Sequence, residues 1–507
     1  MKNKRRFPWT WMLVLLLVAA CVLWPLIPKG FYVTDDGEWM VIRLSAFYQS
    51  LAEGQFPVRL LGRLNNSYGY PVANFLYPGF LYIGSVLHVV GLTFVDSVKV
   101  ILAGSVLGTG IFLFLFLLHW FEVIPSVIGV ITFLGSPYLL YDLYRRGSVG
   151  EVLAFFPAAI MLYSIAASKY WLLSLATAFL IISHNSLALL LGCAIGIYAL
   201  SQENKLKVFW SAMYGVGLSA FFWIPALFER TFVKFDATTI SDPAQYFIGS
   251  HNSLLLGIPV ILALIVSVWA YANQKREVSI FSGIVMIGYF FSLPISQGFW
   301  QIEVFAKIIQ FPYRFLSIPV LFGPWIVSYV CSRFSGIKRT ISISLFVLVW
   351  VYTVYLGTTS IVFVDRPDGY YTTNEGTTTV HDEYLPKWVT HVPLYRAPNV
   401  FDFISGDATM TVNSVSTQLL DVSVIAKQKS LLRINKLYYP GWGVTIDGVL
   451  TPINYQSGDG MMRVDVPEGT HRIIVNFRET IFRFIADAIS GIFGILYLWS
   501  IRRQKHQ

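Results

Sequence analysis

Charge is what this sequence most lacks. Only 13% of its 507 residues are charged, whereas ordinary soluble domains carry about 25%. Hydrophobic residues make up 55% of the chain, and the mean hydropathy is +0.60. A soluble chain of this length would fold into several domains with charged surfaces, and too little charge is present to cover them. The composition therefore excludes a soluble enzyme, a nucleic-acid-binding protein and a disordered chain, and it predicts a polytopic membrane protein.

Cysteine is almost as scarce. Cys21, Cys193 and Cys331 all lie in or beside apolar segments, and the large polar region 362–478 has none. No disulfide framework is expected, and the redox compartment of that region stays open. The sequence also has no internal repeat and no low-complexity tract.

The net charge of +9 is unevenly distributed. Residues 362–478 hold 10 basic and 12 acidic side chains, a net charge of −2, so the rest of the chain carries +11. Much of this charge lies in short basic clusters beside apolar runs, and such clusters are retained on the cytoplasmic side of a membrane. The clusters are Lys2–Arg6, Lys205/Lys207, Lys275/Arg276, Arg333/Lys338/Arg339 and Arg502/Arg503/Lys505.

About thirteen apolar runs approach the roughly 20 residues that a membrane span needs. The first, 9–28, is predicted to be an uncleaved anchor. The spacing of the basic clusters requires one run before Lys205 not to cross, and 74–91, which contains Pro78 and Gly79, is the best candidate for a juxtamembrane or re-entrant helix. The alternative is that 74–91 crosses and 169–182 does not. We expect about 12 transmembrane helices, with both termini cytoplasmic.

Three regions follow from this pattern. Residues 1–361 are predicted to form a transmembrane domain with a large outer loop at 29–96, and 479–507 the last helix and a cytoplasmic basic tail. Between them, 362–478 changes to alternating apolar and polar residues, separated by turn signals such as Pro-Gly and Asp-Gly. That period of two is typical of antiparallel strands, and we expect one extracytoplasmic β-sandwich there.

The first outer loop carries three carboxylates in four positions: Asp35, Asp36 and Glu38. Carboxylates this close to a membrane are costly unless they are solvated or functional. Apolar residues at helical spacing over 38–53 predict an amphipathic helix on the membrane surface, which Asp35 or Asp36 would cap. Helix capping would readily explain the presence of one of these aspartates, but it explains the presence of both less well.

Two further groups of charged residues are predicted on the same side. Arg43, Arg59 and Arg63 lie in the first loop, and the arginine fork suits a phosphate; lipid headgroups or Glu53 are alternative partners. A second group, between two later spans, could meet Asp35 and Asp36 across a cleft, although its arginines could instead mark a different topology. That group comprises Asp142, Arg145, Arg146 and Glu151.

At this point the motifs resemble a known family. They are Asp35-Asp-Gly37, Glu53-Gly-Gln-Phe-Pro-Val-Arg59, Tyr68-Gly-Tyr-Pro71, Phe75-Leu-Tyr-Pro78, Arg146-Gly-Ser-Val-Gly-Glu151, His184-Asn185 and Phe311-Pro-Tyr-Arg314. Together with Tyr439-Pro-Gly-Trp442, they resemble the bacterial membrane proteins labelled pyruvoyl-tetrahydropterin-synthase-related and their lipoteichoic-acid-glycosylating relatives. Those proteins resemble the GT-C class of polyprenyl-phosphate-dependent glycosyltransferases. The pterin label has no counterpart here, because the sequence shows no soluble zinc-histidine enzyme.

The resemblance implies a location in a bacterial plasma membrane, a GT-C-like fold and specific residue roles. Asp35 and Asp36 would be the catalytic pair, one of them acting as base or metal ligand. The substrate-binding candidates are Glu38, Arg43, Arg59, Arg63, Tyr70, Asp142, Arg145, Arg146, Glu151, His184, Asn185 and Arg314. Relatives often have a histidine soon after the first aspartate, whereas Glu38-Trp39 stands here, so Asp35, Asp36 and Glu38 all stay open as the working carboxylate. His184-Asn185 could instead be a pair of helix caps, and Arg314 could pair with Glu303.

No cysteine or histidine spacing indicates a metal site. Adjacent aspartates can bind Mg²⁺ or Mn²⁺ through oxygens, so Asp35 and Asp36 leave a divalent cation open, and no other cofactor is expected.

The leading hypothesis is a membrane-embedded, inverting glycosyltransferase. It would take a sugar from a polyprenyl phosphate to a cell-envelope glycopolymer, with a base near the acceptor hydroxyl and arginines near the departing phosphate. The β-rich domain would cover the site or hold the acceptor. Its Tyr438, Tyr439 and Trp442 would stack on sugars or belong to the core. The alternatives are a transporter or flippase of lipid-linked glycans and a non-catalytic envelope scaffold.

Overall fold

The computed structural model describes residues 8–235, 242–249, 251–271 and 276–504. The basic residues Lys2–Arg6, Lys275 and Lys505, on which the predicted orientation partly rests, lie outside the described residues.

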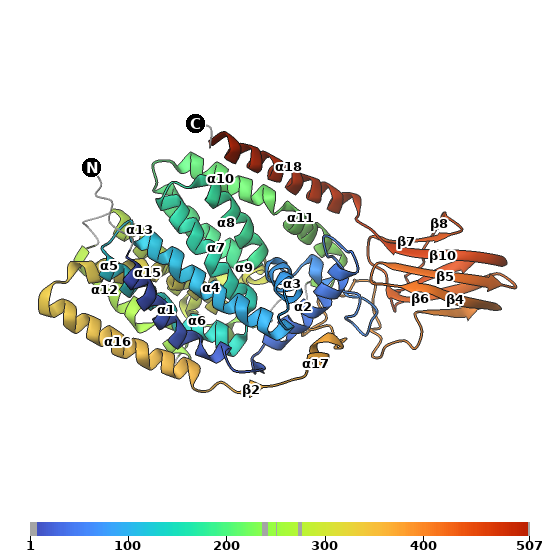
Figure 1. Cartoon of the computed structure of the whole chain (residues 1–507), viewed down its shortest axis with the longest axis horizontal. Helices are drawn as coiled ribbons and strands as arrows, with labels where there is room; N and C mark the ends of the chain where they lie inside the picture. The colour runs from blue at the N-terminus through green and yellow to red at the C-terminus, as the bar shows by residue number, and fades with distance from the viewer. Residues whose placement is uncertain (1–7, 236–241, 250, 272–275, 505–507) are drawn as a thin grey trace.

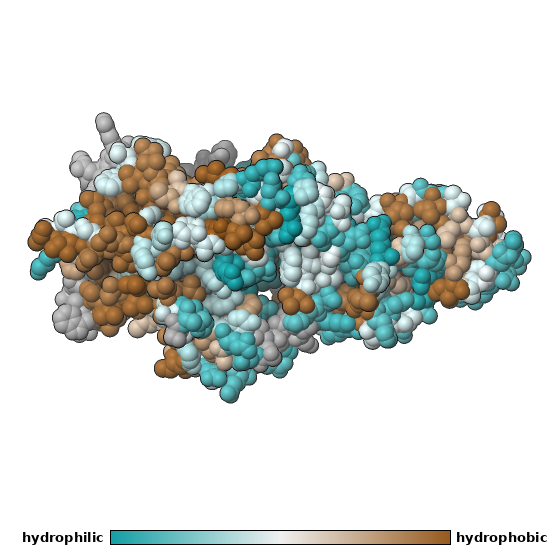
Figure 2. Space-filling model, turned by 90° about the horizontal axis from the view of Figure 1, so that it is seen from below, coloured by the Kyte–Doolittle hydropathy of each residue, from teal (hydrophilic) through white to brown (hydrophobic). Residues whose placement is uncertain are grey.

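A bundle of apolar helices carries a small β-domain at one end (Figure 1). Hydrophobic surface gathers over the helical bundle, and hydrophilic surface predominates toward the β-domain (Figure 2). The chain is a multi-pass membrane protein. Among the described residues, seven helical segments are long and apolar enough to cross a membrane, or nine if two bent pairs count as one span each. The number of 12 crossings stays a prediction.

Four of the seven segments are single helices: α4 (Phe94–Leu117), α7 (Val149–Ala166), α16 (Gly336–Thr358) and α18 (Ile481–Gln504). The other three combine consecutive helices. They are α1 (Trp9–Leu23) with η1 (Trp24–Leu26), α5 (Val123–Leu134) with α6 (Pro137–Tyr141) and η3 (Asp142–Arg146), and η9 (Pro312–Leu316) with α15 (Ser317–Arg333). The bent pairs are α10 (Lys205–Leu218) with α11 (Ala220–Glu229) and η4 (Arg230–Phe232), and α13 (Arg276–Ser292) with η8 (Pro294–Gln301).

Shorter apolar helices complete the bundle. They are α3 (Gly79–Val89), α8 (Tyr170–Ser183), α9 (Asn185–Leu200) and α12 (Ile258–Tyr271), with α14 (Glu303–Ile309) between η8 and η9. With 11 residues, α3 is about 16 Å long, roughly half the thickness of a hydrocarbon core. That length agrees with the prediction of a juxtamembrane or re-entrant segment at 74–91.

The first loop folds into a compact layer at the β-domain end of the bundle. Its helix α2 (Gly37–Ala52) lies against α3 and α4, and α17 (Asp368–Thr372) covers its other side. A two-stranded sheet of β1 (Phe31–Tyr32) and β2 (Phe363–Val364) joins the start of this loop to the chain after α16. The prediction of a membrane-surface helix with one wet face is wrong, because α2 is buried on most sides by these segments.

The β-domain is a two-layer sandwich. One sheet has the order β4 (Ala408–Val415), β5 (Leu419–Ala426), β10 (Gly469–Phe477), β7 (Trp442–Ile446) and β8 (Val449–Thr451), and the other has β3 (Phe401–Ser405), β6 (Ser430–Leu437) and β9 (Met461–Val466). All pairs are antiparallel. Val422, Val475 and Val444 from the first sheet meet Leu432 and Val464 from the second in one core. The strands of the sandwich begin at Phe401 rather than at 362, because most of 362–400 packs on the first loop and contributes β2 to the sheet with β1.

A buried ion pair joins the sandwich to the bundle. Arg483 of α18 binds Glu229 of α11 through two nitrogens, at 2.7 and 2.8 Å, and both residues are at most 1% exposed. The same carboxylate accepts hydrogen bonds from Tyr439 of the β-domain and Asn74 of the first loop. Four segments are thereby held at one point. Tyr439 and Trp442 are buried in the core of the β-domain, as predicted by the alternative in which they are core residues and do not stack on sugars.

Candidate functional site

Two segments far apart in the sequence meet at the β-domain end of the bundle. The backbone N–H of Asp35 donates to the carbonyl of Arg145 at 3.0 Å, and that of Asp36 donates to the carbonyl of Arg146 at 2.8 Å. The sequence predicts a cleft between these two charged groups. In the structure, their backbones are instead hydrogen-bonded to each other directly. Because the two hydrogen bonds are consecutive, they fix the first loop relative to the end of η3.

Gly147 makes this close approach possible. It follows η3, a single π-helical turn, with φ of +66°, in the left-handed region that glycine enters most easily. A Cβ on Gly147 would lie 2.5 Å from Thr34 Oγ1 and 2.8 Å from the Cα of Gly37. Both the backbone conformation and the available space therefore require glycine here.

Asp35 and Asp36 keep their carboxylates free. Asp36 stands at the N-cap position of α2, but its side chain makes no capping hydrogen bond; instead, the N–H of Gly37 donates to Thr34 Oγ1 at 2.9 Å. The prediction that Asp35 or Asp36 caps the helix through its carboxylate is thus wrong. Asp35 is exposed, Asp36 is half-buried, and neither carboxylate has a hydrogen-bond or ion-pair partner among the residues that the structure describes.

Glu38, the third carboxylate, is already bound. Arg366 donates to it through Nε at 2.6 Å, and the hydroxyl of Tyr371 donates to the same oxygen at 3.2 Å. The guanidinium also lies over the ring of Tyr370. This arrangement ties α2 to α17 and distinguishes Glu38 from the two free aspartates.

Glu151 is the centre of a buried charge cluster behind the aspartates. It is fully buried at the start of α7, and its Oε1 accepts from Arg146 at 2.7 Å and from Arg314 at 2.9 Å, while Oε2 accepts from the hydroxyl of Tyr138 at 3.0 Å. His184 Nε2 lies 3.7 Å from the same carboxylate. The expectation that Arg314 could pair with Glu303 is wrong; its partner is Glu151.

The two arginines of this cluster are held at one side and free at the other. Arg146 also binds Asp142 at 2.8 Å and lies over the ring of Tyr313, while Arg314 donates through Nη1 to Ile309 and Gln310. Within the described chain, no hydrogen bond uses Arg146 Nη2 or Arg314 Nη2, and the buried Oδ2 of Asp142 has no partner. The cluster therefore keeps hydrogen-bonding capacity that its own residues do not satisfy.

Tyr77 packs against the buried cluster. Burial raises the pKa of its hydroxyl; Arg43 lowers this pKa, Glu151 and Asp36 raise it, and Arg314 lowers it. Its ring packs on His184 and fills the space that a side chain on Gly150 would occupy. Tyr77 stands in the Phe-Leu-Tyr-Pro motif, yet sequence reasoning did not assign it to the site, because nothing local marks which motif residue faces the charges.

Of the two residues His184 and Asn185, only His184 has the predicted capping role. His184 caps α9, since its Nδ1 accepts from the N–H of Leu187 at 3.2 Å, while its other nitrogen faces Glu151. Asn185 donates to the carbonyl of Phe75 at 3.1 Å and so fixes the chain just before Tyr77.

The three first-loop arginines and Tyr70 are bound to protein partners away from Asp35 and Asp36. Arg59 pairs with Glu479 and Asp487 beside α18. Arg43 donates to Thr378, and Arg63 donates to carbonyls at 371, 372 and 374. Burial lowers the pKa of Arg63 to about 10, with Glu375 acting in the opposite direction. The hydroxyl of Tyr70 bonds to Thr379 and to the N–H of Tyr384.

Arg145 is exposed and lines one end of an apolar groove. The groove has a volume of about 260 Å³ and lies between α6, the start of α12 and the end of α16, with Val33, Tyr141 and Leu356 among its walls. Arg145 has no ion-pair partner among the described residues. A cation therefore stands at the mouth of an apolar channel, next to the backbone of Asp35.

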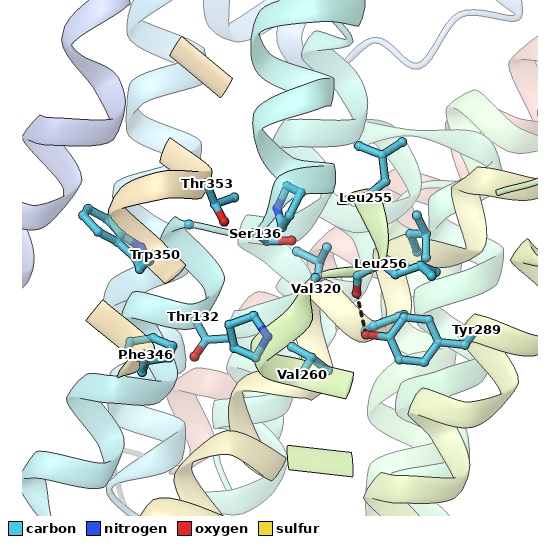
Figure 3. Close-up of a pocket in the computed structure, with 16 residues that line it drawn as sticks. Thr132, Ser136, Leu255, Leu256, Val260, Tyr289, Val320, Phe346, Trp350 and Thr353 are labelled. Atoms are coloured by element: carbon cyan, nitrogen blue, oxygen red, sulfur yellow. Dashed lines mark hydrogen bonds between the residues drawn. The ribbon is translucent and has the colours of Figure 1, made fainter. Parts of the chain in front are cut away.

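The apolar space continues along α16. Phe346, Trp350 and Thr353 of this helix face Val260 of α12 and Val320 of α15 across a narrow pocket (Figure 3). A further pocket of about 240 Å³ follows between α12, α15 and α16, lined by Cys331 and Phe334. Neighbouring pockets share wall residues, so the three lie in a row, and the middle one has a volume of only about 20 Å³. This row of pockets, named here the α16 groove, lies below a helix that the rest of the chain hardly covers.

No group of three or more His, Cys, Asp or Glu side chains is placed to hold a metal ion within the described ranges. Asp35 and Asp36 supply two carboxylates without protein partners. Mg²⁺ commonly binds through one or two carboxylates plus substrate phosphates, and this pair fits that kind of site.

Comparisons with known proteins agree with this architecture. No family model matches the sequence, and no curated protein matches it significantly. Two structures of a mutant of the mycobacterial arabinofuranosyltransferase AftD align with TM-scores of 0.50, at 15% and 14% identity, over 72% and 70% of this chain and 29% and 28% of theirs. ArnT from Cupriavidus metallidurans aligns with a TM-score of 0.46 at 15% identity, over 71% of this chain and 67% of its own. The chain spans less than a third of AftD. The protein therefore has a GT-C-like transmembrane fold joined to a β-rich domain.

Proposed function

We propose that this protein is an inverting membrane glycosyltransferase that transfers a sugar from a polyprenyl-phosphate donor to an extracytoplasmic cell-envelope glycopolymer. The observation that carries the proposal is the backbone pairing of Asp35 and Asp36 with Arg145 and Arg146. It places two unpaired carboxylates beside an unpaired arginine at the mouth of an apolar groove. A transferase acting on a lipid phosphate needs these three elements together: a base, a phosphate ligand and a path for the lipid.

The α16 groove suits the donor lipid. Its walls are apolar along α16, whose 23 residues extend about 34 Å, and its mouth carries the guanidinium of Arg145, which can bind a phosphate through two N–H groups. The polyprenyl chain would lie under α16, and the phosphate would lie beside Arg145. The sugar would then project toward Asp35 and Asp36.

The carboxylates and arginines divide the chemistry. Asp36, or Asp35, accepts the proton of the acceptor hydroxyl as its oxygen attacks the anomeric carbon and the bond from that carbon to the phosphate oxygen breaks. Arg145 and the free N–H groups of Arg146 stabilise the negative charge on the departing polyprenyl phosphate. One displacement from the side opposite the phosphate inverts the anomeric centre. Glu151 does not touch the substrate in this scheme; it holds Arg146 and Arg314 in position.

A divalent cation fits the proposal without being required by it. Mg²⁺ or Mn²⁺ would be held by Asp35 and Asp36 with the donor phosphate, and would neutralise charge on the leaving group.

The distribution of buried charges favours this reaction over transport. Among the described residues, the buried charged groups of the spans and bent pairs are Lys99, Asp142, Arg146, Glu151, Glu229, Arg314 and Arg483. Each lies within about two helical turns of the β-domain end of its helix. A proton- or ion-coupled transporter needs ionisable groups along the interior of its spans, and these residues provide no such path.

The test is the replacement of Asp35 and Asp36 by Asn, singly and together, in cells that lack the wild-type copy. Envelope polymers are analysed by mass spectrometry, and membrane abundance is measured in parallel. We expect the double variant to abolish glycosylation at normal abundance. Asp407→Asn, the same change on the exposed side of the sandwich, is the matched control and should glycosylate normally. Unchanged glycosylation in the double variant would refute the proposal and favour a scaffold.

A further inference from the structure

A second, polar cleft lies at the other end of α2 from the aspartates. It has a volume of about 400 Å³ and is enclosed by the C-terminal part of α2, the following loop, the segments 372–375 and 396–400, and the β4–β5 and β6 portions of the sandwich. This volume lies in the range of sites that bind small organic ligands. We name it the loop–sandwich cleft. None of the residues that form the proposed catalytic site lines it.

Its walls offer hydrogen-bond acceptors that the protein leaves unused. The side-chain nitrogens of Asn66, Asn399 and Asn435 are all held, by Pro393, by Asp402, and by Asn399 together with Asp402. Their amide oxygens accept no hydrogen bond from any described residue. Asn435 is only 5% exposed, so its orientation is set by the interior while its oxygen stays available. Three fixed acceptors that line one cleft are suited to a ligand with several hydroxyl groups.

The floor of the cleft contributes a donor. Lys436 is 8% exposed and donates to the carbonyls of Ser67 and, at 3.5 Å, Gly62. Burial lowers its pKa to about 8. It forms no ion pair within the described chain, and an ammonium group has three donors. One N–H of Lys436 therefore remains for a ligand, next to the amide oxygens.

The cleft is also rigidly framed. Glu53, at the end of α2, accepts from the N–H of Thr417 in the β4–β5 turn, and Gln418 donates to the carbonyl of Glu53 at 3.1 Å. The side chain of Thr417 fills the space above Gly62, where a Cβ would meet it at 2.7 Å. The β4–β5 turn of the sandwich is thus fastened both to the end of α2 and to the loop that follows it, which fixes the position of the sandwich relative to this side of the cleft.

We propose that the loop–sandwich cleft binds a hydroxyl-rich glycan chain, as a distal subsite for the acceptor polymer. The assignment of this glycan as acceptor rests on the proposed function. Most of the 20 residues that line the cleft are polar or charged, and the apolar and aromatic ones are Tyr68, Ala397, Pro398, Val400 and Val415, so a lipid chain does not suit it. Gln49, the first residue of α2 that lines the cleft, lies about 20 Å along the helix from Asp36, so only an acceptor several sugars long could occupy both places. The cleft would therefore select polymers over short acceptors.

The experiment is binding of the full chain, in detergent, to an array of bacterial envelope glycans. The array carries neutral and phosphate-bearing chains of one to ten units. Cys21, Cys193 and Cys331 are replaced by alanine, and Thr373→Cys places one thiol at the rim of the cleft. Val449→Cys, on the opposite edge of the five-stranded sheet from β4, is the control. Each thiol is then blocked with a bulky methanethiosulfonate, which a reductant removes.

We expect binding that rises with chain length, falls at least tenfold when position 373 is blocked, and returns on reduction. Blocking position 449 should leave binding unchanged. Absence of binding to every glycan, or equal binding with the cleft blocked, would overturn the inference. Because binding needs no transfer, the double variant with Asp35→Asn and Asp36→Asn should bind the glycans normally. If that double variant also glycosylates normally, the proposed function fails while the glycan subsite stands.

Discussion

Two neighbouring groups of carboxylates in this protein differ in their surroundings: one is buried and paired, and the other is more accessible and unpaired. Glu151 is fully buried and contacts two arginines, a tyrosine and a histidine. Asp35 and Asp36 are more accessible and have no such partners among the described residues. A buried charge must be paired, because its desolvation is otherwise uncompensated, whereas a carboxylate that accepts a proton from a substrate must be available. We infer that Glu151 holds the neighbouring arginines in position, whereas Asp35 or Asp36 takes part in the reaction.

The largest effect is expected from removing the buried partner. Glu151→Ala leaves Arg146 and Arg314 facing each other without their shared counter-ion, and breaking a buried pair typically costs about 3–5 kcal/mol. We expect a strong fall in the thermal unfolding temperature of the purified protein and the loss of both folding yield and transfer. Glu303→Ala, which removes a largely exposed carboxylate, should change neither. Normal stability of Glu151→Ala would show that this cluster does not hold the site together.

The second effect should separate chemistry from stability. Asp36→Asn keeps size and hydrogen bonding but removes the base, and general-base catalysis typically contributes about 10²–10⁴-fold. We expect kcat to fall within that range while the unfolding temperature stays within one degree or so of wild type. Asp35→Asn, measured alongside, identifies which aspartate acts. If Glu38→Gln lowered kcat more than either aspartate variant at unchanged stability, the division between paired and free carboxylates would be wrong.

Much of the fold could be predicted from the sequence, because its signals are local. Apolar runs and a change of period from 3.6 to 2 mark the positions of most helices and of the strands β6, β7, β9 and β10, but not their ends. The sandwich boundary could not be placed in this way. Residues 362–400 are as polar as the strands that follow, but they pack on the first loop through contacts such as Arg63 with Thr372, which no local pattern records.

The candidate site could be predicted in part. Clustered charges in an apolar chain pointed to both Asp35–Asp36 and Asp142–Glu151, since so few charges are available. Which of them are free depends on tertiary partners. Glu38 and Asp36 look equivalent in the sequence and differ only because Arg366 lies beside one of them. Similarly, Arg59 is a residue type that suits a phosphate ligand, yet it forms ion pairs with Glu479 and Asp487, more than 400 positions away in the sequence.

A smaller effect should follow from disturbing the contact between the two groups. Gly147→Ala forces a side chain into the left-handed region, at a cost of about 1–2 kcal/mol, and its methyl group would contact Thr34 and Gly37. We expect the backbone pairing of Asp35 and Asp36 to loosen, with a moderate fall in both unfolding temperature and kcat. Gly192→Ala, in the interior of α9 with nothing within 4 Å, should be neutral or stabilising. If the two variants behave alike, the close approach at Gly147 is not needed.

The smallest effect is expected at the mouth of the α16 groove. Arg145 is exposed, and a single exposed charge contact is worth up to about 1 kcal/mol, so Arg145→Gln should raise the KM for the polyprenyl-phosphate donor about fivefold and leave the unfolding temperature unchanged. Because salt screens exposed charges, the difference between wild type and variant should shrink as ionic strength rises. Lys338→Gln removes the same charge at the opposite end of α16 and should have no effect on this KM. An unchanged KM in Arg145→Gln would indicate that the phosphate does not bind at the groove mouth but at the free nitrogens of Arg146 and Arg314. The buried cluster around Glu151 would then bind the substrate as well as hold the site together.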